Sequence, residues 1–266
     1  MDIFEAVVLG AVQGLTEFLP VSSSGHLVLF QKIIGVDEPT LLFDTLLHCG
    51  TLAAIFLVLR RDIWALLRNP LQPLSLYLII GTVPAVIAGL FLKDFIEQAF
   101  AGGAFLGYAF IFTSAALFGA EYLSALPGRE RRSGDISWFD ALVIGVLQAV
   151  AIMPAVSRSG LTLSGALARR LERGLAARFS FLLAIPAILG ALVLQIHDLA
   201  AGEGGAPSIG TLPVIAGTLT AALVGIVSVS LMLKLVREHS LKGFGIYTAV
   251  LGVLVLVDQH LSHIFF

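Results

Sequence analysis

The sequence predicts an all-α polytopic membrane protein with six transmembrane helices, two re-entrant helix–loop–helix hairpins and an inverted-topology repeat. Hydrophobic residues make up 58% of the 266 residues, charged residues 13%, and the mean hydropathy is +0.96, outside the usual balance of soluble domains. Apolar stretches of about 20 residues, the length that crosses a bilayer, recur along the chain. Two polar motifs that resemble each other interrupt two further apolar regions. We expect a single membrane domain over residues 1–266.

The two interrupted regions are residues 2–35 and 138–173. Pro, Gly and Ser residues break each of them in the middle, at Leu19–Gly25 and at Met153–Gly160. Irregular backbone at membrane depth is tolerated only where it is buried in protein or lines a wet cavity. Each region therefore predicts a re-entrant hairpin that enters and leaves the membrane on the same side.

Uninterrupted apolar stretches predict the membrane-spanning helices. They cover residues 42–60, 74–93, 103–123, 176–199, 211–235 and 243–264. Three spans follow each hairpin. Because a hairpin returns the chain to the side that it entered from and three crossings then reverse it, the second half of the chain is expected to be inverted relative to the first.

An internal repeat supports this arrangement. At an offset of 135 residues the matching pairs include Gly10/Gly145, Gln13/Gln148, Val21/Val156, Ser22/Ser157, Ser24/Ser159 and Gly25/Gly160. We expect inverted repeats over residues 1–125 and 137–266, joined by a basic cytoplasmic loop. Inverted repeats bring their broken segments together near the midplane of the membrane.

The distribution of basic residues predicts the orientation. Thirteen basic residues are expected on one side: Arg60, Arg61, Arg68, Arg129, Arg131, Arg132, Arg169, Arg170, Arg173, Arg178, Lys234, Arg237 and Lys242. The other side receives Lys32 and Lys93, and Arg158 lies in the second broken loop. By the positive-inside rule the thirteen residues face the cytoplasm, which leaves both termini outside.

The second broken loop has the chemistry of a phosphate site. Ionisable residues at membrane depth usually mark a functional site, and Arg158 presents a planar fork of donors suited to phosphate oxygens. Ser157, Ser159 and Thr162 add hydroxyl groups. The loop leads into a helix through Gly160, and the free backbone N–H groups at the start of that helix favour an anion.

The first broken loop supplies acidic and nucleophilic groups. Gln13 and Glu17 are one helical turn apart, so both can reach one hard cation such as Mg²⁺, or Glu17 can act as a base. Ser22, Ser23 and Ser24 offer hydroxyls, and His26 offers an acid, a base or a nucleophile. Cys49 is the only cysteine, so cysteine-based metal sites are excluded.

Structural interpretations compete with these roles. A Pro-Ser-Gly run is typical of turns and helix caps, and His26 alone is equally consistent with a buried hydrogen-bonded side chain. Glu17 and Arg158 can form a structural ion pair that closes the hairpins. Asp44 and His48, four residues apart, are expected to pack together or to support the site.

The two motifs also resemble those of a known family. The stretches "QGLTEFLPVSSSGH" (13–26) and "PAVSRSGLT" (154–162) are similar to the two signatures of the undecaprenyl pyrophosphate phosphatase family, the bacitracin-resistance type of bacterial inner-membrane enzymes. The likeness extends over the whole length. The sequence departs from the family pattern at Ala155, where the pattern has Gly.

The resemblance implies a function. Such an enzyme hydrolyses undecaprenyl pyrophosphate to undecaprenyl phosphate and phosphate, recycles the lipid carrier for cell-wall synthesis, confers bacitracin resistance and needs a divalent cation, Mg²⁺ or Ca²⁺. The implied partners are this polyprenyl lipid and membrane lipids, with no nucleic acid and with a homodimer as a further expectation. The active site is expected to face the periplasm. A lipid-phosphate flippase or an anion transporter is the alternative, because inverted hairpins are also a transporter architecture.

The resemblance also implies residue roles. Glu17 with Gln13 would hold the cation or prepare the nucleophile. Arg158 would bind the pyrophosphate. The supporting substrate-binding residues would be Ser22, Ser24, Ser157, Ser159 and Thr162. Ser23 and His26 are the leading candidates for nucleophile and acid–base partner, and attack by water remains the alternative.

Overall fold

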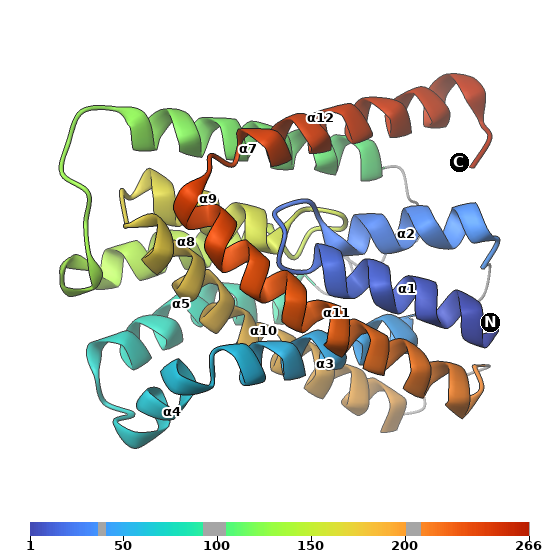
Figure 1. Ribbon diagram of the computed structural model, residues 1–266, viewed down its shortest axis with the longest axis horizontal. Coiled ribbons are helices and arrows are strands. Elements are labelled where there is room, and N and C mark those ends of the chain that lie inside the picture. The colour runs from blue at the N-terminus through green and yellow to red at the C-terminus, as the bar shows by residue number, and fades with distance from the viewer. Residues whose placement is uncertain (37–40, 93–104, 201–208, 266) are drawn as a thin grey trace.

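The computed structural model describes residues 1–36, 41–92, 105–200 and 209–265, and this part of the chain is helical without a β-strand (Figure 1). The predicted all-α membrane fold is confirmed. Most helices run roughly along the long axis of the molecule, so the molecule has two ends (Figure 1). Both chain termini lie at the same end, which we call the terminal end.

The two predicted hairpins are present. The first consists of α1 (Ile3–Thr16) and α2 (Ser23–Ile34), and the second of α8 (Trp138–Val150) and α9 (Arg158–Ala168). The first enters from the terminal end and the second from the opposite end, and both turn back in the middle of the molecule (Figure 1). Each hairpin is re-entrant, and the two are inverted relative to each other.

Long helices form the six spans. Their bounds are α3 (Leu41–Val58), α5 (Pro73–Phe91), α7 (Leu106–Ala125), α10 (Arg173–Ala200), α11 (Thr211–Glu238) and α12 (Lys242–Val257), with a π-helical turn at Asp258–Ser262. Five are long and apolar enough on their own, and α3 qualifies together with the helix that follows it. Lys93 and the start of the span predicted at 103 lie outside the described residues.

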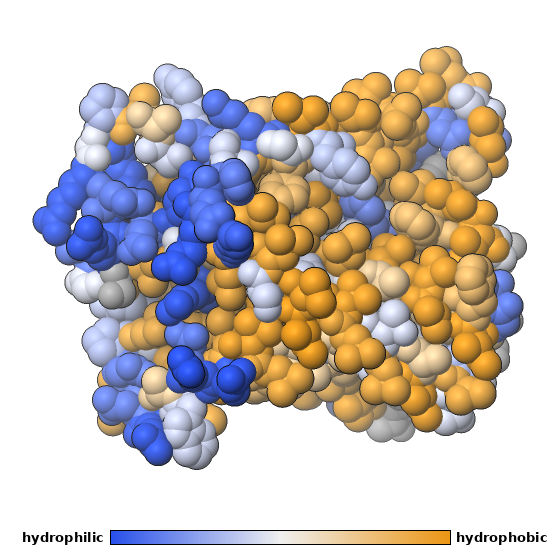
Figure 2. Space-filling view, in the orientation of Figure 1, coloured by the Kyte–Doolittle hydropathy of each residue, from blue (hydrophilic) through white to orange (hydrophobic). Residues whose placement is uncertain are grey.

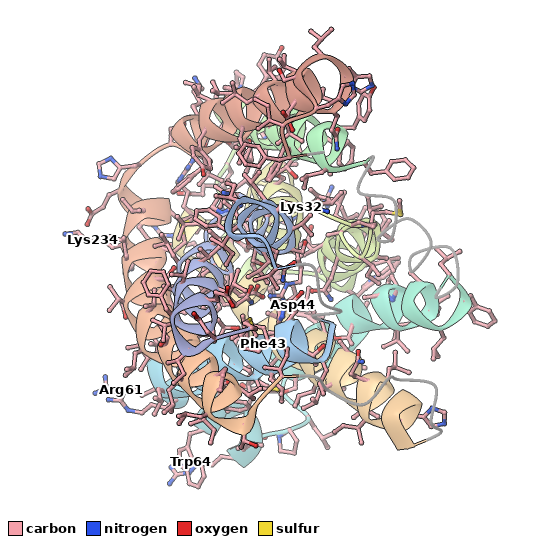
Figure 3. The ribbon with its side chains drawn as sticks, turned by 90° about the vertical axis from the view of Figure 1, so that its right-hand side faces the viewer. Lys32, Phe43, Asp44, Arg61, Trp64 and Lys234 are labelled. Atoms are coloured by element: carbon pink, nitrogen blue, oxygen red, sulfur yellow. The ribbon has the colours of Figure 1, made fainter. Side chains whose placement is uncertain are left out.

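The span predicted over residues 42–60 ends earlier than expected. The chain bends by 78° after Val58 into α4 (Arg60–Arg68), which the hydropathy pattern did not reveal. Charged arginines are costly in hydrocarbon, and the bend carries Arg60 and Arg61 out of the line of the span. Arg61 and Trp64 accordingly project from the periphery of the bundle (Figure 3).

Glycines at equivalent positions of the repeat pack each hairpin against a span of the other half. A β-carbon at Gly10 of α1 would collide with the backbone of Gly217 in α11, and one at Gly145 of α8 would collide with Gly81 in α5. Small residues allow such close approach of membrane helices. The two halves of the chain are therefore interlocked.

The end opposite the termini carries the polar surface. The α4 helix, the connection between α7 and α8, the end of α9 and the junction of α11 with α12 all lie there, and Figure 2 shows hydrophilic residues gathered at this end. Asp140 anchors the connection at α8, since it accepts from Arg131 at 2.7 and 2.8 Å and from Arg169 at 2.7 Å. The hydrogen bonds from Arg131 to Asp140 raise the pKa of the Arg131 guanidinium. The elements that bear the thirteen basic residues thus meet at one end.

Candidate active site

The tips of the two hairpins meet in the middle of the molecule. Ser159 at the start of α9 donates a hydrogen bond from Oγ to the carbonyl of Leu19 at 2.8 Å. Arg158 forms an ion pair with Oε1 of Glu17, which ends α1. Glu17 is almost fully buried, with 5% of its surface exposed. The acidic and basic halves predicted from the two loops are brought into direct contact.

Glu17 is held by donors on both carboxylate oxygens. Besides Arg158 on Oε1, Oε2 accepts from Ser23 Oγ at 2.6 Å and from Gln13 Nε2 at 2.9 Å. His48 Nε2 lies 3.4 Å from the same oxygen. The hydroxyl of Ser23 therefore points at a carboxylate that can accept its proton.

Arg158 is fixed by the helix that it begins. Ser157 caps α9, since its Oγ accepts from the N–H of Gly160 at 3.0 Å, and its own N–H donates to Thr113 Oγ1 at 3.1 Å. A second guanidinium nitrogen of Arg158 donates to the carbonyl of Ala184 in α10 at 3.2 Å. These contacts aim the guanidinium at Glu17 and leave further N–H donors for a ligand.

A cavity of about 310 Å³ lies beside this contact. Both hairpin tips, α3 and α10 contribute its walls. The polar side chains that line it are Glu17, Ser23, Ser24, Thr45, His48, Ser157, Arg158 and Ser159. The remaining wall is apolar and includes Ala187, Ile188 and Ala191 of α10. Serines, a carboxylate and a guanidinium around one cavity suit the binding and attack of a phosphate group.

The cavity lies toward the terminal end of the molecule. Thr45 and His48 belong to the first two turns of α3, and Ala191 belongs to the second half of α10. Both segments lie on the terminal side of the hairpin tips (Figure 1). A ligand would therefore reach the hairpin tips most directly from the terminal end.

His26 is not brought into the cavity. Its Nδ1 donates to the carbonyl of Ser22 at 2.7 Å, and the hydroxyl of Tyr247 lies 2.8 Å from Nε2. The imidazole stacks on the Tyr247 ring and meets the edge of Phe110, and only 3% of the residue is exposed. In this arrangement Nδ1 is bonded within the first turn of α2 and Nε2 joins α2 to α12.

Other predicted residues support the cavity from behind. Ser22 caps α2 by accepting from the N–H of Gly25 at 3.1 Å. Thr162 donates to the carbonyl of Arg158 at 2.8 Å and lies 2.5 Å from the hydroxyl of Ser180. Neither hydroxyl faces the cavity. The geometry gives Ser22 and Thr162 positions that shape the two loops.

His48 is the residue that the sequence undervalued. Its Nδ1 contacts the carbonyl of Asp44 at 2.7 Å, and since a carbonyl can only accept, Nδ1 carries a hydrogen and Nε2 faces Glu17. Asp44 itself accepts from Gln31 at 3.0 Å. The available signal was the i and i+3 spacing of Thr45 and His48, which places both on one face of the span.

The residues around Glu17 fit a divalent cation that shares its ligands with phosphate. The buried Oε1 of Gln13 has no hydrogen-bond partner among the described residues, so an oxygen ligand is available beside the Glu17 carboxylate. The described part of the chain contains no group of three or more His, Cys, Asp or Glu residues able to cage a metal. Mg²⁺ typically binds through one or two carboxylates together with substrate phosphates.

Comparisons with known proteins agree with this site. The family model described as bacitracin resistance protein BacA matches residues 6–254. The chain is 46% identical over 259 residues to undecaprenyl-diphosphatase 4 of Bacillus thuringiensis subsp. konkukian (strain 97-27) and 48% identical over 259 residues to undecaprenyl-diphosphatase of Carboxydothermus hydrogenoformans. Undecaprenyl-diphosphatase of Methanosphaera stadtmanae is 37% identical over 279 residues. Each match covers 97% of this chain and 98% of the relative. The chain belongs to the BacA family of bacitracin resistance proteins.

Proposed function

We propose that the chain hydrolyses undecaprenyl pyrophosphate to undecaprenyl phosphate and inorganic phosphate. The observation that carries this proposal is the cavity in which Glu17 and Ser23 of the first hairpin meet Arg158 of the second. The relatives named undecaprenyl-diphosphatase support the same activity.

Arg158 binds the pyrophosphate. Its guanidinium has five N–H donors and uses some of them on Glu17 and Ala184, so others remain for phosphate oxygens. Ser24 and Ser157 line the same cavity and add hydroxyl groups, whereas the hydroxyl of Ser159 already donates to the carbonyl of Leu19. Fixed donors in a partly dry cavity stabilise the charge that develops as the phosphoryl group transfers.

Ser23 is the nucleophile in this proposal. Its Oγ attacks the terminal phosphorus, the proton moves to Glu17, and the bond to the undecaprenyl phosphate oxygen breaks. Glu17 then gives this proton to the departing undecaprenyl phosphate. Water attacks the phosphoserine, Glu17 takes the proton of that water and passes it to Ser23 Oγ, and the bond from Oγ to phosphorus breaks to release inorganic phosphate. The 2.6 Å hydrogen bond from Ser23 to Glu17 supports Ser23 over His26, whose nitrogens are engaged outside the cavity.

Gln13 and Glu17 would hold the divalent cation, Mg²⁺ or Ca²⁺. When bound, the cation neutralises part of the pyrophosphate charge. The unpartnered Oε1 of Gln13 is the observation that supports this assignment. The protein supplies few ligands, so tight binding of the cation is expected to require the substrate.

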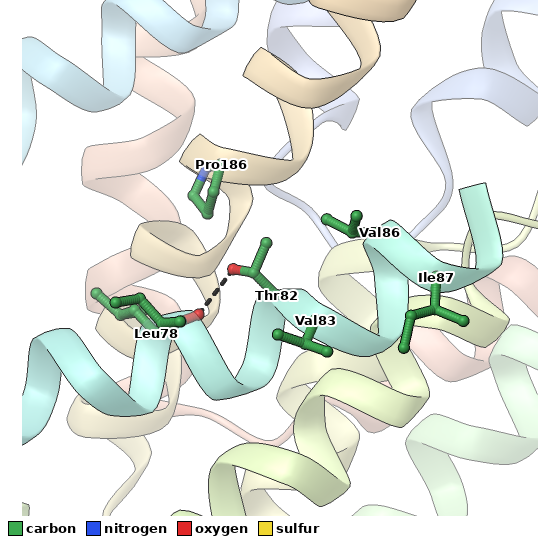
Figure 4. Close-up of a pocket in the computed structure, with 7 residues that line it drawn as sticks. Leu78, Thr82, Val83, Val86, Ile87 and Pro186 are labelled. Atoms are coloured by element: carbon green, nitrogen blue, oxygen red, sulfur yellow. Dashed lines mark hydrogen bonds between the residues drawn. The ribbon is translucent and has the colours of Figure 1, made fainter. Parts of the chain in front are cut away.

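An apolar groove of about 290 Å³ is the proposed path of the prenyl tail. Six residues of α5, from Leu78 to Ile87, line it together with Pro186 of α10 (Figure 4). The one hydroxyl in its wall, that of Thr82, is bonded to the carbonyl of Leu78 at 2.7 Å, so the groove presents hydrocarbon. Pro186 adjoins Ala187 and Ile188, which line the cavity.

The site faces the periplasm in this proposal, and the protein lies in the bacterial inner membrane with both termini outside. Support comes from the basic end of the molecule, which the positive-inside rule assigns to the cytoplasm, and from the position of the cavity toward the other end. In a Cys49→Ser background, Lys32→Cys is expected to react with an impermeant thiol reagent in intact cells and Arg129→Cys is not. Selective reaction at position 129 would reverse the orientation.

Phosphate release tests the activity. Purified protein in detergent is expected to release phosphate from a prenyl pyrophosphate, to stop when EDTA removes the cation and to recover when Mg²⁺ or Ca²⁺ is added back. Absence of turnover by the wild-type chain on prenyl pyrophosphates would instead favour transport of a lipid phosphate or an anion. Turnover that persists in EDTA would refute the requirement for a cation and would leave the proposed hydrolysis standing.

A further inference from the structure

A second polar cavity, of about 430 Å³, lies at the basic end of the molecule, between the first turns of α10 and the last turns of α11. It is separate from the candidate active site, which is formed by the hairpin tips. Its lining consists of Gly174, Arg178, Ser230, Leu233, Lys234, Arg237 and Glu238. The proposed hydrolysis assigns no role to any of them.

The cavity carries an excess of positive charge. Three cations face one carboxylate, that of Glu238. Arg178 has an ion pair with Asp62 of α4 at a distance of 3.6 Å, with both side chains partly exposed. Lys234 and Arg237 make no hydrogen bond or ion pair with another residue in the described part of the chain. Cations gathered around one cavity without full compensation favour an anionic ligand.

The backbone adds to the attraction for an anion. A β-carbon at Gly174 would lie 3.0 Å from Nε of Arg237, so this guanidinium lies against the first turn of α10. Backbone N–H groups in the first turn of a helix lack partners within the helix and carry partial positive charge. The cavity thus combines side-chain cations with a helix start.

The position of the cavity points to a lipid. The ion pair between Asp62 and Arg178 connects the cavity to α4. The α4 helix has the composition of a membrane-surface helix, and the guanidinium of Arg68 lies 5.2 Å from the centre of its Trp64 ring. Lys234 projects outward at the periphery of the bundle, as Arg61 and Trp64 do (Figure 3). The cavity therefore lies at the level of the lipid head groups.

The surface of α11 beside the cavity suits an acyl chain. Val227, Leu231 and Lys234 follow the i, i+4 and i+7 spacing and share one face of the helix. Val227 is 66% exposed and Leu231 44% exposed, which leaves an apolar strip that leads away from the cation. We propose that this cavity binds the phosphate of an anionic phospholipid, whose acyl chains lie along this strip.

Lipid binding to the full-length protein in detergent tests the proposal. The probe is fluorescent phosphatidylglycerol, with phosphatidylcholine of the same acyl chains as the neutral reference. The wild type is expected to prefer phosphatidylglycerol. Lys234→Gln combined with Arg237→Gln is expected to weaken phosphatidylglycerol binding about 30-fold, because each cation near an anionic lipid contributes about fivefold.

A matched control separates the cavity from general surface charge. Arg129→Gln combined with Arg132→Gln removes the same charge from the exposed connection between α7 and α8 and is expected to change affinity by less than about twofold. An equal loss in both double variants, or no loss in the first, would overturn the proposal. Inorganic phosphate that displaces the lipid probe as well as unlabelled phosphatidylglycerol does would show that the site serves free phosphate. Lys234→Arg with Arg237→Lys should keep the affinity.

Discussion

The two hairpins share one construction and differ in chemistry. Each has a glycine that packs against a span, a buried glutamine near the end of its first helix and a serine that caps its second helix. At the position of Glu17 in the first hairpin, the second has Ile152, and at the position of Ser23 it has Arg158. The two tips thus contribute different groups to one cavity: the carboxylate of Glu17 and the hydroxyl of Ser23 come from the first, and the guanidinium of Arg158 comes from the second.

The buried glutamines of the two hairpins differ in their hydrogen-bond partners. Gln13 donates to Glu17 at 2.9 Å, whereas both polar atoms of the Gln148 amide are buried without a partner in the described part of the chain. A buried polar group without a partner costs about 1 to 3 kcal/mol. The amide therefore has a partner only where an acid follows one turn later.

Arg158→Ala gives the largest expected effect, because it removes the guanidinium that binds the pyrophosphate in the proposed function. We expect kcat to fall about 10³-fold, the upper range for loss of a fixed donor to a developing charge. Arg158→Lys keeps the charge but loses the planar fork, so it should restore only part of the activity. Initial rates of phosphate release measure both. Arg129→Gln is the control, and wild-type turnover in Arg158→Ala would contradict the split site.

The first tip is tested by asking whether Glu17 and Ser23 act as a unit. Glu17→Gln and Ser23→Ala are each expected to lower kcat about 10²-fold, within the range for loss of positioned proton transfer. The double variant should be no slower than the slower single variant, because residues of one catalytic unit are strongly non-additive. Multiplied effects would show independent roles and would favour attack by water. Ser124→Ala, whose hydroxyl bonds the backbone of α7, is the control.

Substitutions of the two glutamines compare the hairpins through smaller expected effects. Gln148→Met replaces the unpartnered amide by an apolar chain of similar size and is expected to stabilise the protein by about 1 to 3 kcal/mol. Gln13→Met removes a donor to Glu17 and should reduce phosphate release instead. Thermal unfolding in detergent together with activity distinguishes the two. A lower melting temperature for Gln148→Met would mean that this amide has a partner, such as a buried water.

Local sequence patterns were enough to predict the spans, the two hairpins and the pairing of their tips. Hydropathy and the Pro, Gly and Ser breaks located the spans and hairpins, and the 135-residue offset paired the two tips. The bend after Val58 was missed because an apolar window runs on across it. The direction of His26 was also out of reach, because Tyr247, its partner, lies 221 residues away on α12 and no periodicity connects the two. The contact of His48 with Glu17 is long-range for the same reason.

The smallest effect concerns the loop backbone of the second hairpin. Ala155, which stands where the family pattern has Gly, has φ +60°, a left-handed conformation that disfavours residues with a β-carbon by about 1 to 2 kcal/mol. Ala155→Gly removes this strain but gives the unfolded chain more freedom, so we expect a net stabilisation of about 0.5 to 1 kcal/mol. Ala151→Gly in the same loop is the control: with φ −76° it has no strain to lose and should destabilise the protein by a similar amount. Opposite shifts in melting temperature would show that the left-handed backbone conformation at position 155 favours glycine. Shifts of the same sign would mean that this tip relaxes around Ala155, and the second hairpin would then be less rigid than the first.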